Sequence, residues 1–352
     1  MDYKIITTED AFLAERETWT EICGKMTNPT PFQTWEWNYI WWKNNEPEDS
    51  LYILKAFEGK KVFGYAPLLL KDGWVEFIGG RDMDYGRFVV CHKAIPVIEG
   101  FLGLLLDKKY SIRLQEMAAG DTQLHIVQKA LDKQRGYLCY ATTRTMWVQT
   151  EKYASFEEYF SLVSQSMRNK TIKAGLKKGV RLAQEEVTDK LCEEIQEIFA
   201  NRQEVRGGSR DISWAIRVIK QMNGQGLLDV YTARVGDEAI GFLVAMKYQD
   251  SVYIWLVAFK GEYKDCFPGQ LLFYETIKDG FAEGKDKIDF MRGDYDFKAR
   301  WECALDSNYT VCIYRSRFAR FKKKTALKWR PRLKKIIYGN GLLKRIYKKY
   351  AR

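Results

Sequence analysis

The chain has 352 residues, of which 46% are hydrophobic and 14% aromatic, so it is long enough for two domains with substantial cores and is not globally disordered. Its net charge of +11 comes from one segment. Residues 315–352 hold sixteen Lys and Arg and no acidic residue, and the remaining 41 basic and 46 acidic residues leave the body at −5. This balance argues against a nucleic-acid-binding body.

Cysteine and histidine usage restrict the chemistry further. The seven cysteines are scattered and never spaced as CxxC, which argues against a disulfide scaffold or a cysteine zinc site and favours a reducing compartment. Only His92 and His125 are present, so a multi-histidine metal centre is excluded and we expect no metal. The first twenty residues are polar and the apolar runs are too short to cross a bilayer, so we expect a cytoplasmic protein.

The first half of the chain predicts the element order β-α-α-β-β-β-α-β. Glu58-Gly59-Lys60 and Lys71-Asp72-Gly73 are turn signals that separate the three consecutive strands. The expected elements are Tyr3–Thr7, Ala11–Met26, Thr34–Trp42, Leu51–Phe57, Lys61–Leu70, Trp74–Ile78, Ala94–Leu106 and Ser111–Met117.

The second half repeats this order. The expected elements are Val180–Val187, Asp189–Val205, Ile212–Met222, Leu227–Val235, Ala239–Tyr248, Ser251–Phe259, Gly269–Glu283 and Lys287–Met291, followed by a strand at Tyr309–Tyr314. Residues 56–65 align with residues 233–242 at an offset of 177, although two hairpins can resemble each other by chance. The matching order favours two copies of one α/β unit. Between the halves, Ser166–Lys173 predicts a basic helix that holds an anionic group or is simply solvated.

The strongest local signal is a strand, a polar loop and a helix that begins at Pro268-Gly269. The first amides of a helix are free to bind an anion, and glycine allows a phosphate to approach the backbone closely. Pro268 is suited to the first helical position. By itself this motif is weak, because most Pro-Gly pairs are only turns.

The position of this motif resembles the junction that cradles coenzyme A pyrophosphate in GNAT acyltransferases. Residues 268–272 (PGQLL) and residues 289–301 (DFMRGDYDFKARW) are similar to the CelD-like (BioF2-like) acetyltransferases, as are residues 31–37 (PFQTWEW). That family shows a small-Pro-Gly-x-x-Leu helix start and a DF-x-RG-D-x-x-[YF]-K-x-x-[WF] block. The resemblance extends to about Tyr314, and one departure is that Cys266-Phe267 stand where a smaller residue is usual.

This resemblance implies acetyl-CoA or another acyl-CoA as co-substrate. Its pantetheine would lie between the strands at Val252–Phe259 and Lys287–Met291, and the acceptor would attack the thioester directly. The expected donor-binding residues are Val257, Phe259, Pro268, Gly269, Gln270 and Leu271.

Because histidine is scarce, the general base is expected to be a carboxylate, a tyrosine or water. Asp294 is the first candidate and Asp289 the second, with Lys298 stabilising an oxyanion or neutralising Asp294. The alternative is that these three residues and Arg292 form an internal salt-bridge network that only fixes the strand.

The first half has no equivalent phosphate turn, so we expect its loop at residues 79–88 to face the acceptor. The candidate acceptor-binding residues are Asp84, Tyr85, Arg87, Arg168 and Arg292. A hydrogen-bonded loop without a ligand is the alternative. The helical spacing of the tryptophans at 35, 37, 41 and 42 indicates a buried face rather than sugar platforms.

The basic C-terminal segment is amphipathic. Leu342, Leu343, Ile346, Tyr347 and Tyr350 fall on one helical face, opposite four Lys and Arg residues. This pattern favours an anionic membrane surface, with RNA contact or a solvated extension as alternatives. A position on the inner face of the plasma membrane follows from this hypothesis.

Together these patterns predict an α/β (α+β) chain of two tandem GNAT-like domains with mixed central sheets. We expect a degenerate, acceptor-side domain at 1–150, an acyl-CoA-binding domain at 151–320 and a basic amphipathic helical tail at 321–352. The expected activity is acyl-CoA-dependent N- or O-acylation of a small-molecule or lipid-linked sugar for envelope or exopolysaccharide synthesis. Alternatives are a Fem-type transferase that uses aminoacyl-tRNA to extend peptidoglycan precursors, although the chain lacks the long helical arm, and a non-catalytic membrane-associated scaffold.

Overall fold

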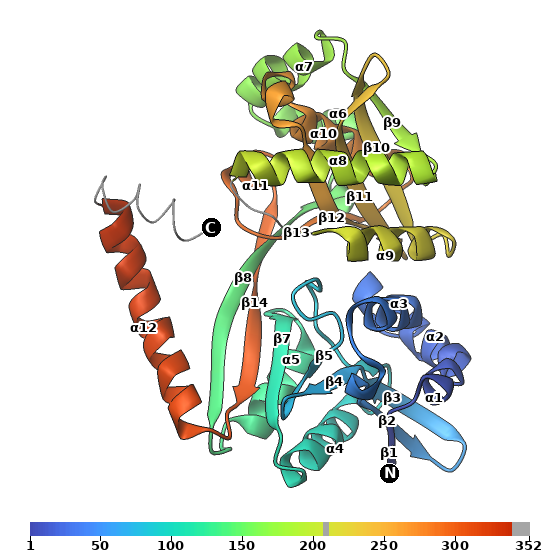
Figure 1. Cartoon of the computed structure of the whole chain (residues 1–352), viewed down its shortest axis with the longest axis vertical. Helices are drawn as coiled ribbons and strands as arrows, with labels where there is room; N and C mark the ends of the chain where they lie inside the picture. The colour runs from blue at the N-terminus through green and yellow to red at the C-terminus, as the bar shows by residue number, and fades with distance from the viewer. Residues whose placement is uncertain (207–210, 340–352) are drawn as a thin grey trace.

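The computed structural model describes residues 1–206 and 211–339, without the side chains of 203–206 and 330–339. Over these ranges the chain is a mixed α/β protein with two β-sheets. The smaller sheet has the order β1-β2-β3-β6, and the larger has the order β4-β5-β7-β14-β8-β13-β12-β11-β10-β9. Figure 1 shows the two halves of the chain one above the other, linked by the long strands β8 and β14.

The first half contains the expected elements and three that the sequence did not indicate, β6, α5 and β8. Its elements are β1 (Asp2–Ile6), α1 (Glu9–Leu13), α2 (Arg16–Gly24), α3 (Trp35–Asn45), β2 (Ile53–Glu58), β3 (Lys61–Ala66), β4 (Leu68–Lys71), β5 (Trp74–Phe77), β6 (Val89–Val90), α4 (Ala94–Asp107), β7 (Ser111–Ala118), α5 (Thr122–Leu131) and β8 (Tyr137–Gln149). The single strand expected at Lys61–Leu70 is divided at Pro67, which cannot donate to a ladder, and its two parts belong to different sheets. The expected helix Ala11–Met26 is likewise two helices.

The second half follows the expected order more closely. Its elements are α6 (Phe156–Leu162), the π-helix η4 (Ser166–Lys173), α7 (Ala174–Leu176), β9 (Arg181–Glu185), α8 (Asp189–Arg206), α9 (Ser213–Asn223), β10 (Leu228–Val235), β11 (Glu238–Tyr248), β12 (Ser251–Phe259), the 3₁₀-helix η5 (Gly261–Cys266), α10 (Pro268–Ala282), β13 (Lys287–Arg292), α11 (Asp296–Ala299), β14 (Ala304–Ile313) and α12 (Arg317–Gly339). The chain leaves α10 through Gly284 at φ 65°, the left-handed stop that the sequence predicts.

Alternate residues of β11 face two different cores. Phe242, Val244 and Met246 pack in the core that includes α8, α9 and the first half of the chain, whereas Leu243 and Ala245 pack beneath α10. The predicted aromatic helix also packs in the first of these cores. Its four tryptophans at positions 35, 37, 41 and 42 are all buried, as their spacing predicts.

Strand β14 crosses the boundary that the sequence suggests near residue 150. It pairs antiparallel with β7 on one side and with β8 on the other. Strand β8 in turn pairs with β13, so one ladder continues from the first half into the second. The sequence assigns β14 to the second unit, but the structure places it between β7 and β8, two strands of the first half, within the larger sheet.

Candidate active site

The parallel strands β12 and β13 separate after three paired positions. Ser251, Val252 and Tyr253 pair with Lys287, Ile288 and Asp289, and beyond them β12 continues to Phe259 without a partner on that side among the described strands. Two irregularities accompany the separation: the β11–β12 register shifts at Val244/Ala245, and Met291 in β13 has a φ of 62°. Unpaired backbone groups of β12 therefore border a cleft that an extended ligand can enter.

This cleft, which we call the donor cleft because the sequence analysis expects an acyl donor there, has a volume of about 290 Å³. Trp255, Leu256 and Val257 of β12 line one side, while Phe290 and Met291 of β13 line the other. Val257 thus lies where the sequence predicts a donor contact. Phe259 does not line the cleft, because its ring lies over the start of α10.

The start of α10 offers one vacant amide to a ligand. Phe267 has φ 55°, and its carbonyl accepts from the amides of Gln270 at 2.9 Å and Leu271 at 3.0 Å. The amide of Gly269 has no hydrogen-bond partner among the described residues. Pro268 has no N–H, so Gly269 is the one residue in the first turn of α10 whose amide lacks a hydrogen-bond partner.

Two side chains lie near Gly269, an aromatic ring and a cation. A Cβ built on Gly269 would lie 3.3 Å from Cδ1 and Cε1 of Phe259, so the ring partly covers this corner. The Arg202 guanidinium of α8 lies 4.5 Å above the same ring and lines the donor cleft. Leu271 is fully buried, and the Gln270 side chain accepts a hydrogen bond from Trp301 at 2.9 Å, so these two residues act through packing.

Asp84 and Arg292 form a buried ion pair at the edge of the donor cleft. Arg292 Nε lies 2.9 Å from Oδ1 of Asp84, and the Arg292 amide donates to Oδ2 at 2.8 Å. Burial raises the pKa of Asp84 to about 6, and the Arg292 charge opposes the rise. A carboxyl that titrates in this range and borders the cleft is suited to accept a proton from an acceptor.

Lys298 binds the backbone at the end of β13. Its Nζ donates to the carbonyls of Phe290 at 2.5 Å, Met291 at 3.2 Å and Arg292 at 2.7 Å, and the side chain is only 5% exposed. Burial lowers the pKa of Lys298 to about 8. The ammonium therefore holds three carbonyls that diverge at the bend of the strand.

Lys298→Met is expected to lower the free energy of unfolding by about 3 kcal/mol, because buried carbonyls would lose their donor at roughly 1–3 kcal/mol each. Urea unfolding measures this change. The control is Lys278→Met, since Lys278 is exposed and pairs with Glu275 only at the surface, so we expect a change below about 0.5 kcal/mol. Equal losses for both variants would contradict a structural role for the Lys298 ammonium.

The other two catalytic candidates lie outside the donor cleft. Asp289 is fully buried, and its carboxylate receives Tyr85 Oη at 2.7 Å, Lys287 Nζ at 2.6 Å and the Met291 amide at 2.7 Å. Asp294 is exposed, with Arg144 Nη1 at 3.8 Å. Among the described residues no ion pair joins two of Asp289, Arg292, Asp294 and Lys298, and the three that form ion pairs do so with residues outside this set.

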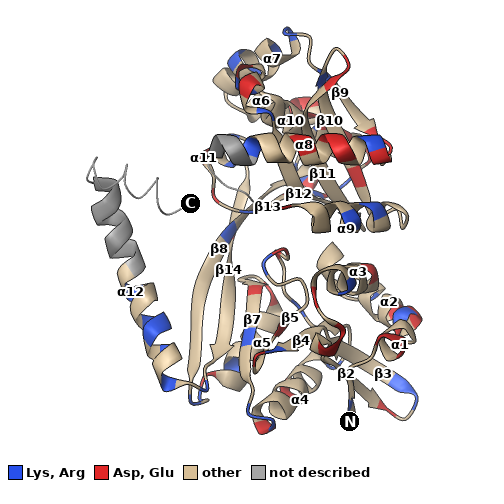
Figure 2. Cartoon of the chain, viewed as in Figure 1, with Lys and Arg blue, Asp and Glu red and all other residues tan. Residues whose placement is uncertain are grey.

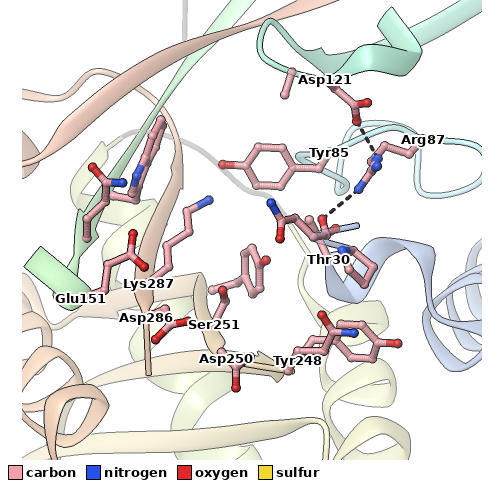
Figure 3. A pocket seen from close by; sticks show the side chains of 17 residues that line it. Thr30, Tyr85, Arg87, Asp121, Glu151, Tyr248, Asp250, Ser251, Asp286 and Lys287 are labelled. Carbon is pink, nitrogen blue, oxygen red and sulfur yellow. Dashed lines mark hydrogen bonds and ion pairs between the residues drawn. The ribbon is translucent and has the colours of Figure 1, made fainter. Parts of the chain in front are cut away.

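The residues expected to bind the acceptor do not lie together. Asp84 and Arg292 border the donor cleft, whereas Tyr85 and Arg87 line a second cavity of about 370 Å³ (Figure 3). Arg87 is held by Asp121 at 2.5 Å. Arg168 lines neither cavity, because it lies on η4, where its Nε donates to the Val163 carbonyl at 2.9 Å.

Aromatic rings enclose a cation in this second cavity. Lys287 Nζ lies 4.8 Å from the ring centre of Trp147, 5.5 Å from Tyr85 and 5.8 Å from Tyr253. Glu151, Asp250 and Asp286 lie at the rim, and Figure 3 shows them on the Lys287 side of the cavity. Flat rings with charged groups at their edges suit a hydroxylated ligand.

A single layer of side chains separates the two cavities. Along β12, Tyr253 lines the second cavity and Ile254 the donor cleft; along the loop at residues 79–88, Tyr85 lines the second cavity and Asp84 the donor cleft. The Asp289 carboxylate, bonded to Tyr85, lies at the last paired position of β12 and β13. The two cavities are therefore neighbours, and the layer between them lies where β12 and β13 begin to separate.

In the second half of the chain, a parallel strand pair that separates is followed by a helix start that carries a glycine. Residues 163–299 match the acetyltransferase (GNAT) domain, so this part of the chain is a GNAT-family acetyltransferase domain, as its motifs predict. A comparison with curated protein sequences gave no match.

Solved structures with this fold cover nearly the whole chain. FemX is 15% identical with a TM-score of 0.64, covering 89% of this chain and 98% of its own. The C-terminal domain of a putative lysylphosphatidylglycerol synthetase from Agrobacterium fabrum is 10% identical with a TM-score of 0.61, covering 90% and 97%. A tandem GNAT protein from the clavulanic acid biosynthesis pathway is 13% identical with a TM-score of 0.51, covering 90% and 99%. At these identities the likeness establishes the fold alone.

Proposed function

We propose that the chain transfers an acyl group from acyl-CoA to an amino or hydroxyl group of a sugar or cell-envelope precursor. The observation that carries this proposal is the separation of β12 and β13 directly beside the vacant Gly269 amide and Arg202. Open strand edges suit the pantetheine amides, and a vacant helix amide beside a cation suits the diphosphate. The proposal includes a tandem architecture of two GNAT-like domains.

Asp84 is our proposed general base, ahead of Asp294 and Asp289. The acceptor N–H or O–H gives its proton to the Asp84 carboxylate as its N or O atom bonds to the thioester carbonyl carbon. The C–S bond then breaks, and the coenzyme A sulfur leaves as a thiolate or takes a proton. Arg292 keeps Asp84 in place, and Lys298 holds the strand beside it.

The second cavity is proposed to hold the part of the acceptor that does not react. Its rings would stack on a sugar while Arg87 and Lys287 receive a carboxylate or phosphate. The aromatic enclosure and the common boundary with the donor cleft support this assignment.

Aminoacyl transfer of the Fem type is the second candidate, because the fold is similar to that of FemX. Thermal unfolding with coenzyme A or with aminoacyl-tRNA separates the two. Coenzyme A at about 100 times its dissociation constant should add about 2.7 kcal/mol and raise Tm by about 4 °C. Stabilisation by aminoacyl-tRNA alone would favour the Fem-type activity, and stabilisation by neither would contradict both.

A further inference from the structure

A cavity of about 690 Å³ lies at the base of α12, where the helix leaves the end of β14. Five cations and no acidic side chain line it: Arg135, Arg315, Arg317, Arg320 and Lys324. None of the five forms an ion pair with a carboxylate in the described ranges. Cations gathered without counter-ions repel one another, and an anion in the cavity would remove that repulsion.

Backbone carbonyls hold two of these guanidinium groups in place. Arg315 donates from Nε to Tyr110 and from Nη2 to Leu106, both at 3.0 Å. Arg320 donates from Nη2 to the Tyr137 carbonyl at 3.0 Å. Its Nε is buried and has no partner among the described residues. These hydrogen bonds fix the positions of two of the five cations, unlike a set of freely moving surface lysines.

Next to the cavity, α12 carries large apolar side chains that face solvent. Phe318, Phe321 and Trp329 are 75%, 68% and 48% exposed, and at 100° per residue they share one helical face. Lys324 and Lys328 lie beside this face. Figure 1 shows α12 standing apart from the sheets, and Figure 2 shows no acidic residue on its described part.

Exposed aromatic rings beside cations are typical of helices that lie in a membrane interface. None of the helices in the described ranges combines the length and apolar character needed to span a bilayer. Phosphate contact with RNA would use the cations but would not require three aromatic rings on one face. The combination therefore favours a lipid surface over RNA. The apolar face that the sequence predicts at Leu342–Tyr350 lies outside the described residues.

We propose that the cavity at the base of α12 binds the phosphate of an anionic phospholipid headgroup while the aromatic face of α12 enters the interface. The binding is non-covalent and needs neither an acyl donor nor an acceptor. The proposal is therefore independent of the proposed acyl transfer, and either can fail without the other.

Sedimentation of the full chain with vesicles tests this proposal. We expect binding to phosphatidylcholine vesicles that contain phosphatidylglycerol and much weaker binding to phosphatidylcholine alone. The triple variant Arg135→Gln, Arg317→Gln, Lys324→Gln should lower the partition coefficient by about 100-fold, at about fivefold per charge. Phe318→Ser with Phe321→Ser should lower it by at least about tenfold. Deletion of residues 321–352 should release the chain.

The matched control removes three exposed cations on other elements: Lys60→Gln, Lys152→Gln and Lys190→Gln. It should lower partition by less than about fivefold, since these charges lie outside the cavity. An equal loss for the two triple variants would overturn the proposal, because net charge alone would then explain binding. Binding to RNA that the cavity variant abolishes, without binding to vesicles, would also overturn it. Melting curves confirm that each variant is folded.

Discussion

Asp84→Asn should lower kcat by about 100-fold or more while the KM for the acyl donor changes little. Amide nitrogen cannot accept the proton of the acceptor, and positioned general bases contribute about 10²- to 10⁴-fold. The substitution keeps the shape of the side chain, and its single amide oxygen can accept one of the two hydrogen bonds from Arg292. Steady-state kinetics with a purified acyl-CoA and a panel of amino and hydroxyl sugars measures both constants.

The pH profile adds a readout that a merely structural role would not change. Asp84 accepts a proton only when ionised, so the wild-type rate should fall about tenfold per pH unit below its pKa of about 6. Above about 8, Lys298 loses its charge and one of its three donors, and the rate should fall again. Asp84→Asn should abolish the acidic limb.

Asp229→Asn is the matched control, because Asp229 is a half-buried carboxylate that pairs with Lys247 and lies outside the donor cleft. It should keep kcat within about twofold. If Asp84→Asn retained the wild-type rate and acidic limb while Asp294→Asn lost them, the base would be Asp294, as the sequence motif first suggests.

Gly269→Asp should weaken coenzyme A binding by at least about 30-fold. The carboxylate would lie beside the vacant amide that we assign to the diphosphate, and two unit charges 4 Å apart repel by about 4 kcal/mol at an effective dielectric constant of 20. A Cβ at this position also presses on Phe259 at 3.3 Å. Isothermal titration calorimetry gives the dissociation constant directly.

Gly103→Asp is the control for placing aspartate within a helix, since a Cβ there meets nothing within 4 Å. It should leave coenzyme A affinity unchanged. An unchanged affinity in Gly269→Asp would place the diphosphate elsewhere. Full cellular function in that variant would support a non-catalytic scaffold.

Local sequence patterns predict the donor side of the site well. A continuous apolar strand, Pro268-Gly269 and Gly284 are each determined by neighbouring residues, and their element bounds are correct within a few residues. The resemblance to GNAT motifs adds the chemistry. Local patterns therefore predict the strand and the helix that border the cleft, and the place expected for the donor comes from the resemblance.

Contacts between distant residues could not be predicted. Asp84 and Arg292 are 208 positions apart, and no spacing rule joins them. Gly293 has φ 102°, and such a turn reorients the chain so that Asp294 is exposed, although strand alternation gave no sign of it. Arg202 is part of an ordinary amphipathic helix in the sequence, and only the packing of α8 on β12 brings it over Phe259.

The position of β14 has a consequence for synthesis of the chain. Strand β7 can pair with β14 only after residues 304–313 have left the ribosome. That edge of β7 therefore stays unpaired while most of the polypeptide is synthesised. An unpaired strand edge can pair with other chains, and domains usually fold while the chain is still being synthesised. This protein is instead expected to complete the first-half part of its larger sheet only after most of the second half has been translated, which makes chaperone protection during elongation important for its yield.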